Sequence, residues 1–335
     1  MSQKENQKVL VTGGGGFLGK AIVRLLVATG DYTVKSFSRK FYPELDSLGI
    51  QQIQGDISNI KKVECACKGV NLVFHVAAKA GVWGEYGEYY KTNVVGTKNV
   101  LNACLKHGIS RLVYTSSPSV VFDGSDAKGI DESVSYPKSY HSHYSKTKAI
   151  AEQFVIKATQ PGLKTIILRP HLIWGPEDTN LVPRIISRAR QLFIVGNGNN
   201  LVDTLYIDNA AHAHVLAAEK LLENPNLSGR IYFISQDEPV YLWDMINNIL
   251  KAAGLKPVKK KIPKQVAWLA GAVLELIFNT LRIKKEPQLT RFVVKELAAS
   301  HWFDISAAKI DLGYAPGISI KDGLCRLETW LEKSM

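Results

Sequence analysis

Short apolar runs alternate with amphipathic segments along the first half of the chain. Runs with the length and content of buried strands occupy residues 8–13, 32–39, 50–56, 71–78, 111–117, 164–170 and, later, 230–235. Apolar positions spaced three and four apart predict helices at 17–28, 93–108 (closed by Gly108), about 140–159 and 206–222 (N-capped by Asp208). Strands that alternate with helices are typical of an α/β fold with a doubly wound, mostly parallel sheet of the Rossmann type.

The remaining residues are less regular, and proline and glycine mark their turns. We predict a dinucleotide-binding domain in residues 1–170 and 206–235, and a smaller C-terminal substrate lobe in 171–205 and 236–335. In this lobe the segment 265–281 is largely apolar, Glu275 interrupts it, and it is too short for a membrane span. Three interpretations stay open for it: a core helix, a lid over a channel for alkyl chains, or a helix on a membrane surface.

Composition narrows the class of protein. Hydrophobic residues make up 46% of the 335, which is typical of a globular chain. The net charge of +12 favours anionic ligands, but lysine and arginine are spread along the chain, so we expect no nucleic-acid partner. Cys65 and Cys67 lack further ligands nearby, so no metal site is expected. The polar N-terminus predicts a cytoplasmic protein, with peripheral contact at the membrane as an open alternative.

Four glycines lie between the first strand and the first helix, in VTGGGGFLGK at residues 11–20. A strand, a glycine turn and a helix N-terminus form an anion site, because free N–H groups point outward and the helix dipole adds positive charge. Registers that start at Gly13 or Gly14 both fit; in each, Gly16 lets the backbone approach a pyrophosphate and Gly19 lets the helix pack closely. The predicted dinucleotide contacts here are Gly13, Gly16, Phe17, Leu18 and Gly19.

The end of the second strand predicts which dinucleotide binds. Ser38 and Arg39 stand where an NAD site usually has a carboxylate. A carboxylate would repel a 2′-phosphate, whereas a guanidinium can grip it, so we predict NADP(H) in preference to NAD(H). The alternative is that Arg39 is a solvated loop residue. Asp56, after the third strand, could accept a hydrogen bond from the adenine amine.

The stretch YHSHYSKTK, residues 140–148, holds the candidate acid-base residues. Residues four apart share a helical face, which pairs Tyr144 with Lys148 and excludes Lys146. A cation beside Tyr144 is expected to lower the pKa of the phenol, which would then protonate a carbonyl oxygen. A serine at the end of the fifth strand, Ser117 or its rival Ser116, is expected to orient that oxygen.

The histidines of this stretch are not expected to take part in catalysis. A spacing of two suits neither helical metal ligation nor a shared face, so we expect surface or loop positions for His141, His143, His212 and His214. Tyr140 stays open between lining the substrate entrance and packing.

Several motifs together resemble the extended short-chain dehydrogenase/reductases and, within them, the 3β-hydroxysteroid dehydrogenase family: VTGGGGFLG, VFHVAA, YTSSPSVVF, YSKTK and LRPHLIWGP. The similarity covers nearly the whole chain. In that family the catalytic serine stands three residues before a valine, here Val120, so the resemblance implies Ser117 beside Tyr144 and Lys148. It also implies cofactor contacts at Ile57, Ala77, Ala78, Lys79, Thr115, Tyr144, Lys148, Pro170 and Ile173.

Longer segments, such as AAKAGVWGEYGEYYKTNVVGT and EPQLTRFVVKELAASHWF, are similar to bacterial reductases of long-chain 2-alkyl-3-oxo acids in olefin biosynthesis. This resemblance implies NADPH-dependent reduction of the 3-oxo group, a homodimer and pathway enzymes as partners. Trp83 and Tyr86, with Ser117, are tentative substrate contacts, although aromatic packing is the alternative for the first two. Arg184 is either a contact to a substrate carboxylate or a solvated residue.

Three other functions stay open. The first is a 3β-hydroxysteroid or C4-decarboxylating sterol dehydrogenase, which shares the active-site pattern and acts on steroid-like lipids. The second is a nucleotide-sugar epimerase or dehydratase, which the apolar second lobe disfavours. The third is a non-catalytic protein that senses NADP, which the intact Tyr144 and Lys148 disfavour.

Overall fold

The computed structural model describes residues 7–283 and 285–334 and contains a seven-stranded parallel sheet. The strand order is β12-β7-β5-β4-β1-β2-β3. The strands are β1 (Gln7–Thr12), β2 (Tyr32–Ser38), β3 (Gln51–Gln54), β4 (Leu72–His75), β5 (Arg111–Thr115), β7 (Lys164–Pro170) and β12 (Arg230–Ile234). Each overlaps a predicted run, with β1 beginning one residue earlier than predicted, which confirms the doubly wound fold. The strand order reverses between β1 and β4, and ligands of such sheets bind at the carboxyl ends of the strands at this point.

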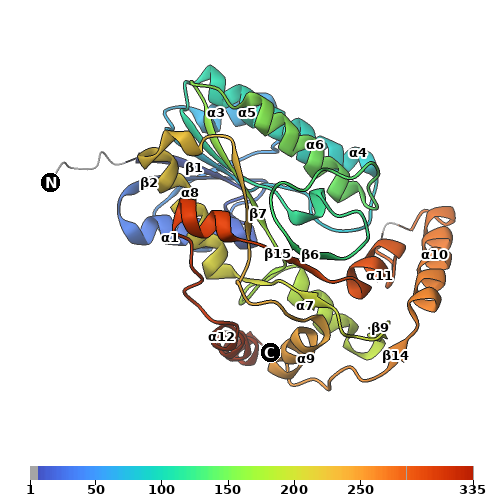
Figure 1. Ribbon diagram of the computed structural model, residues 1–335. Helices are drawn as coiled ribbons and strands as arrows, with labels where there is room; N and C mark the ends of the chain where they lie inside the picture. Colours follow the sequence, from blue (N-terminus) through green and yellow to red (C-terminus); the bar gives the residue numbers. More distant parts are fainter. Residues whose placement is uncertain (1–6, 284, 335) are drawn as a thin grey trace.

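Helices cover both faces of this sheet. Figure 1 shows α3, α4, α5 and α6 along one side of it and α1 and α8 on the other. These helices are α1 (Phe17–Thr29), α3 (Ile60–Cys67), α4 (Tyr86–Tyr89), α5 (Gly96–Lys106), α6 (His143–Ala158) and α8 (Ile207–Glu223), with a short α2 (Pro43–Asp46) after β2. Strands buried on both faces explain why their sequences read as continuous apolar runs.

The helix ends differ from the prediction in three places. A π-helical segment, Tyr90–Val95, precedes α5, so the helix expected at 93–108 starts earlier and changes its winding. Helix α6 begins later than expected, because the Ser142 hydroxyl accepts the Ser145 N–H and forms the N-cap. The prediction for Asp208 is wrong: it lies within the first turn of α8 and pairs with Arg326 instead.

The C-terminal elements gather beside the carboxyl edge of the sheet (Figure 1). The helices are α7 (Leu181–Arg188), α9 (Leu242–Ala252), α10 (Lys264–Thr280), α11 (Arg291–Ala298) and α12 (Ile320–Ser334). A four-stranded sheet joins β13 (Val240–Tyr241), β10 (Leu201–Val202), β15 (His301–Phe303) and β6 (Ala127–Ile130). Two pairs complete the lobe: β8 (Ile173–Trp174) with β11 (Leu205–Tyr206), and β9 (Ile194–Val195) with β14 (Lys261–Ile262). The division into two domains stays a prediction, since β6 comes from the first half of the chain.

Helix α10 corresponds to the apolar segment whose role was open. Only Ala267 and Gly271 of this helix are buried, so the interpretation as a core helix is wrong. No helix among the described residues is long and apolar enough to cross a bilayer.

Candidate functional site

The glycine loop between β1 and α1 is built on close backbone approaches. A side-chain Cβ at Gly19 would lie 2.1 Å from the Gly13 carbonyl oxygen, so only glycine lets the helix lie against the turn. Gly13 has φ +73° and its added Cβ would meet the Ala77 backbone at 3.0 Å. Gly16, by contrast, is exposed at the N-terminus of α1, where no described side chain caps the helix. The Gly16 N–H closes the turn by donating to the Gly13 carbonyl at 2.8 Å, whereas the first N–H groups of α1 have no side-chain cap. This helix start therefore fits a bound pyrophosphate.

Ser38 and Arg39 lie beside this loop, at the end of β2. The Ser38 hydroxyl accepts a hydrogen bond from the Gly15 N–H at 3.0 Å, so Ser38 fixes the loop. Arg39 is exposed. Asp56 accepts bonds from the Ser58 N–H and hydroxyl, which hold the pKa of its carboxyl low, and the nearby Lys91 and Arg39 add to this shift.

One aromatic residue of this region was missed. A Cβ at Gly15 would lie 2.0 Å from the Tyr42 ring, so Tyr42 packs directly on the loop. The side-chain amide of Gln52 bonds both the N–H and the carbonyl of Tyr42, at 3.0 Å each. No motif in the sequence indicated this contact, because it depends on how the β2–β3 connection folds back.

The segment after β4, which contains Ala77, Ala78 and Lys79, lies next to the glycine loop. Asn93, which the sequence analysis did not single out, holds it: its amide bonds the N–H of Lys79 at 2.8 Å and the carbonyl at 3.1 Å. Asn93 also donates to Thr147 of α6 at 3.0 Å. This buried amide therefore couples the predicted cofactor segment to the helix that carries Tyr144.

Ser117 and Tyr144 lie together where β5 ends. The Ser117 hydroxyl donates to the Ser119 hydroxyl at 3.0 Å. Its proximity to Tyr144 lowers the pKa of the phenol, but burial raises that pKa more. Both residues line a cavity of about 550 Å³, whereas Ser116 is not among its lining residues. The Ser116 hydroxyl is buried and has no hydrogen-bond partner among the described residues.

Lys148 lies one helical turn beyond Tyr144, but its ammonium group binds to β5. It donates to the Thr115 carbonyl at 2.6 Å and to the Tyr114 hydroxyl at 2.8 Å. Burial lowers the pKa of Lys148 to about 7, although Glu152 opposes this. In this structure burial raises the pKa of Tyr144 and Ser117 opposes that rise, while Lys148 is not among the causes of the shift. A phenol with a raised pKa stays protonated at neutral pH and can act as a proton donor.

The prediction of a surface position is wrong for one histidine. His214 is fully buried, because α8 packs against the sheet, and its ring bonds Thr115 at 2.9 Å and the Ala210 carbonyl at 2.7 Å. Burial lowers the pKa of His214 to about 4, so it is neutral. It therefore supports the residue that holds Lys148. His141, His143 and His212 are exposed, as expected.

The remaining residues predicted to contact the cofactor or the substrate are spread over several parts of the structure. Pro170 lines the cavity beside Ser117. Ile57 is buried under α5, where an added Cβ at Gly96 would meet it at 2.5 Å. Ile173 begins β8, one residue after Leu172, whose φ of 41° is unusual for a branched side chain. Tyr140 is partly buried and packs on the hydrophobic core.

The two aromatic residues proposed as substrate contacts do not lie among the described residues that line the cavity. Trp83 packs edge-on against Phe278 of α10 and donates to the Ile283 carbonyl at 3.3 Å. Tyr86 lies on the surface beside His143. The structure therefore favours packing for both, and Trp83 joins the loop after β4 to α10.

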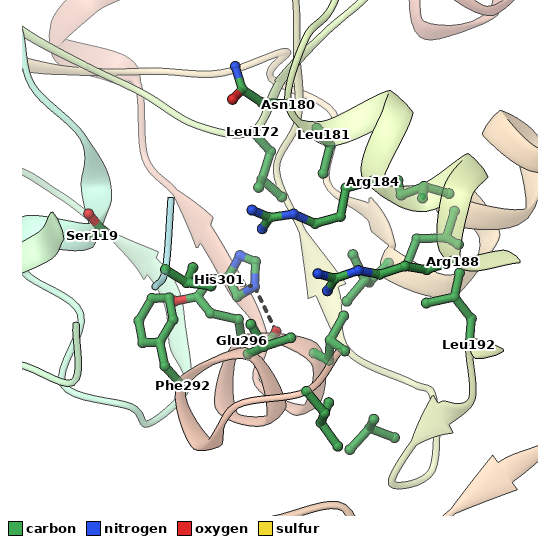
Figure 2. A pocket seen from close by; sticks show the side chains of 18 of the residues that line it. Ser119, Leu172, Asn180, Leu181, Arg184, Arg188, Leu192, Phe292, Glu296 and His301 are labelled. Atoms are coloured by element: carbon green, nitrogen blue, oxygen red, sulfur yellow. Dashed lines mark hydrogen bonds and ion pairs between the residues drawn. The ribbon is translucent and has the colours of Figure 1, made fainter. Parts of the chain in front are cut away.

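The cavity is largely apolar, and its few charged groups come from the C-terminal lobe. Figure 2 shows Arg184 and Arg188 pointing from α7 into it. Glu286 bridges them, with oxygen–nitrogen distances of 2.9 Å to Arg184 and 3.0 Å to Arg188. The alternative of a solvated Arg184 is wrong, because its side chain is partly buried in this ion pair.

A histidine pair also faces the cavity. The ring nitrogens of His171 and His301 lie 2.7 Å apart, and burial lowers the pKa of both. His301 also contacts the Glu296 backbone carbonyl (Figure 2), and burial raises the pKa of the Glu296 carboxyl to about 7. Sequence reasoning missed this cluster because 130 residues separate the two histidines.

Comparison with known proteins gives the family of this chain. The model of the 3-beta hydroxysteroid dehydrogenase/isomerase family matches residues 10–264. A 2-alkyl-3-oxoalkanoate reductase from Shewanella oneidensis is 50% identical over 96% of this chain and 85% of its own length. The same-named protein of Stenotrophomonas maltophilia is 48% identical over 96% of this chain and 98% of its own length. A mouse sterol-4-alpha-carboxylate 3-dehydrogenase, decarboxylating, is 34% identical over 96% of this chain and 90% of its own length.

Solved structures show the same fold in more distant proteins. A UDP-glucuronic acid 4-epimerase from Bacillus cereus, in complex with NAD, superposes with a TM-score of 0.74 at 24% identity. The superposition covers 98% of this chain and 99% of the epimerase chain. The three relatives from Shewanella oneidensis, Stenotrophomonas maltophilia and mouse are reductases and a dehydrogenase, so this protein is an oxidoreductase. The chain belongs to the 3-beta hydroxysteroid dehydrogenase/isomerase family.

Proposed function

We propose that this protein uses NADPH to reduce the 3-oxo group of a long-chain 2-alkyl-3-oxoalkanoic acid to a hydroxyl group. The observation that carries the proposal is the position of the Ser117–Tyr144 pair, which opens into a large cavity with an apolar lining. Two relatives that are about half identical to this chain are named for such a reductase activity. An apolar cavity suits alkyl chains, which gain free energy when they leave water.

The residues around the carbonyl have distinct tasks in this proposal. A reduced nicotinamide, when bound, supplies the hydride. Tyr144 donates a proton to the carbonyl oxygen, which Ser117 orients from the end of β5. Lys148, whose pKa of about 7 leaves it partly charged at neutral pH, lies below the site, and the Thr115 carbonyl fixes its position.

A carboxylate on the substrate is compatible with the charges of the cavity. Arg184 and Arg188 share one glutamate, Glu286, which leaves one unit of positive charge in excess at this place. Arginine binds carboxylates through paired hydrogen bonds, so a substrate carboxylate could join or displace Glu286. This is a reason to prefer an acid over a neutral ketone as the substrate.

Arg39 is the support for NADPH over NADH. It is exposed at the end of β2, beside the glycine loop, and no acidic residue occupies positions 38–40. Replacement by alanine is expected to weaken NADPH binding about tenfold and to leave NADH binding nearly unchanged, since only NADPH has the 2′-phosphate. Dissociation constants from cofactor fluorescence measure this. Tighter binding of NADH than of NADPH by the wild type would contradict the cofactor assignment.

A sterol dehydrogenase is the second candidate. The 34% identical mouse relative is named for oxidation of a sterol-4-alpha-carboxylate, and a broad apolar cavity suits a sterol as well. In both substrates a carboxylate lies two carbons from the reacting carbon, so Ser117 and Tyr144 do not discriminate between them.

A substrate panel separates these functions. Purified protein is assayed with a 2-alkyl-3-oxo acid, a 4-carboxysterol and a UDP-sugar, each with the phosphorylated and the unphosphorylated cofactor. We expect turnover of the 2-alkyl-3-oxo acid with NADPH to have the highest kcat/KM. A higher value for the sterol would favour the second candidate, and turnover of the UDP-sugar alone would overturn both.

The assembly and location of the protein remain proposals. We propose a homodimer in the cytoplasm that associates with other enzymes of the same pathway, on the resemblance described above. We also propose that residues 1–170 and 206–235 bind the cofactor, while 171–205 and 236–335 bind the substrate. The glycine loop and the cavity-lining arginines support this division, because they lie in different parts of the chain.

A further inference from the structure

Helix α10 presents an apolar stripe to its surroundings. Its outer face consists of side chains at helical spacing, with exposed fractions of 42% to 68%: Val266, Leu269, Val273, Leu276 and Ile277. Trp268 beside this stripe and Leu281 just after the helix are also exposed, at 41% and 66%. Contiguous apolar surface of this kind on a folded protein marks a contact with a partner or a membrane. Figure 1 shows α10 at the edge of the molecule, with α11 on its inner side.

The inner face of α10 is apolar as well, but it is covered. Gly271 lets the helix lie against α11, since an added Cβ would meet the Arg291 nitrogen at 3.0 Å. Ala267, Ala270 and Leu274 line the cavity that also contains Tyr144. Helix α10 alone therefore separates the cavity from the outer face.

Lysine and arginine residues flank this apolar stripe at both of its ends. Residues 259–285 contain seven lysine or arginine residues and one acidic residue, Glu275. Glu275 is turned toward α11, where it forms an ion pair with Arg291 at 2.6 Å. Exposed cations among the described residues of this range are Lys259, Lys260, Lys261, Lys264, Arg282 and Lys285.

We propose that the outer face of α10 docks on the surface of an anionic phospholipid bilayer. An apolar stripe with tryptophan, flanked by lysine and arginine, is the pattern of helices that lie in the plane of a membrane interface. The apolar side chains enter the acyl boundary while the cations contact lipid headgroups. A second copy of this chain fits less well, because the same cationic ends would face each other and repel.

The docking has a consequence for the proposed reaction. A long-chain acid dissolved in the bilayer would reach the cavity past α10, without crossing water. This consequence rests on the proposed function, whereas the docking itself does not, and a binding assay without substrate separates the two.

The test is flotation of the purified full-length protein with two kinds of vesicle. One kind is phosphatidylcholine, and the other contains equal parts of phosphatidylcholine and phosphatidylglycerol. We expect binding to the second kind at low salt, weaker binding at high salt because of screening, and little binding to the first. The double variant Leu269→Glu, Leu276→Glu is expected to bind at least about tenfold more weakly, because two exposed leucines that would enter the acyl boundary are lost.

A matched double variant, Leu222→Glu with Ile310→Glu, controls for the added charge. Both residues are exposed, at 48% and 81%, and neither belongs to α10, so lipid binding is expected to fall much less than in the α10 variant. Circular dichroism checks that both variants fold. Equal binding of wild type and the α10 variant would overturn the proposal, and so would no binding to either vesicle. It would also be overturned if the α10 variant only converted a dimer to a monomer in light scattering.

Discussion

The region around β1, β5 and α6 and the region around α10 and α11 hold their charged side chains in opposite ways. In the first, the Arg169–Glu152 pair has side chains only 2% and 0% exposed, and Lys148 is buried against β5. In the second, the Arg291–Glu275 pair is 52% and 14% exposed, and leucine side chains face outward. A charge taken out of water must be held by fixed partners. The charged side chains of the first region are therefore held in place by the protein alone. The exposed side chains of the second region depend on what covers them.

The largest expected difference between the regions is in stability. Arg169→Met leaves Glu152 buried without its cation and is expected to lower the free energy of unfolding by about 3–5 kcal/mol. The matched change Arg291→Met breaks a more exposed pair and is expected to cost at most about 1 kcal/mol. Urea denaturation of both variants measures this. Equal losses would remove the contrast between the two regions.

A pH-dependent effect is expected for Lys148. Its pKa of about 7 in the folded protein lies below that of an unfolded lysine, so unfolding takes up a proton between these values. The free energy of unfolding should therefore rise between about pH 7 and pH 9, by roughly 1–3 kcal/mol more in wild type than in Lys148→Met. Urea midpoints at the two pH values provide the comparison. Parallel pH profiles would show that Lys148 is not held in this buried state.

The smallest of the three effects concerns cofactor affinity. Gly19→Ala places a methyl group against the Gly13 carbonyl and pushes the start of α1 away, which is expected to weaken dinucleotide binding roughly tenfold. Gly317→Ala, in the loop before α12, is the matched change away from the glycine loop. Its added Cβ meets its nearest atom, in Asn209, only at 3.9 Å, so binding should not change. Titration calorimetry with NADPH tests the pair, and unchanged affinity in Gly19→Ala would contradict the close approach.

Much of the first region was predictable because its signals are local. Alternating strands and helices, the spacing of the glycines, and the spacing of four between Tyr144 and Lys148 can each be read within short segments. The partners of these residues were not predictable, because they come from distant segments. The Lys148 ammonium binds strand β5 more than 30 residues away, and His214 supports Thr115 from 99 residues away.

The second region was less predictable for a different reason. Apolar periodicity indicates a helix at 265–281 but does not say whether a core, a cavity or solvent meets each face. Here one face of α10 lines the cavity and the other is exposed, so packing excludes the core helix that the sequence left open. The cluster of His171, His301 and Glu296 also depends on tertiary contacts.

The most direct test of the account is the rate of NADPH consumption with a long-chain 2-alkyl-3-oxo acid, in wild type and in Tyr144→Phe. Phenylalanine removes the proton donor from the Ser117 contact but keeps the ring, so kcat should fall by about two to four orders of magnitude while NADPH affinity is unchanged. The product of the wild type should be the 3-hydroxy acid. A variant that keeps most of its kcat, or a wild type that does not reduce this acid, would contradict the central claim.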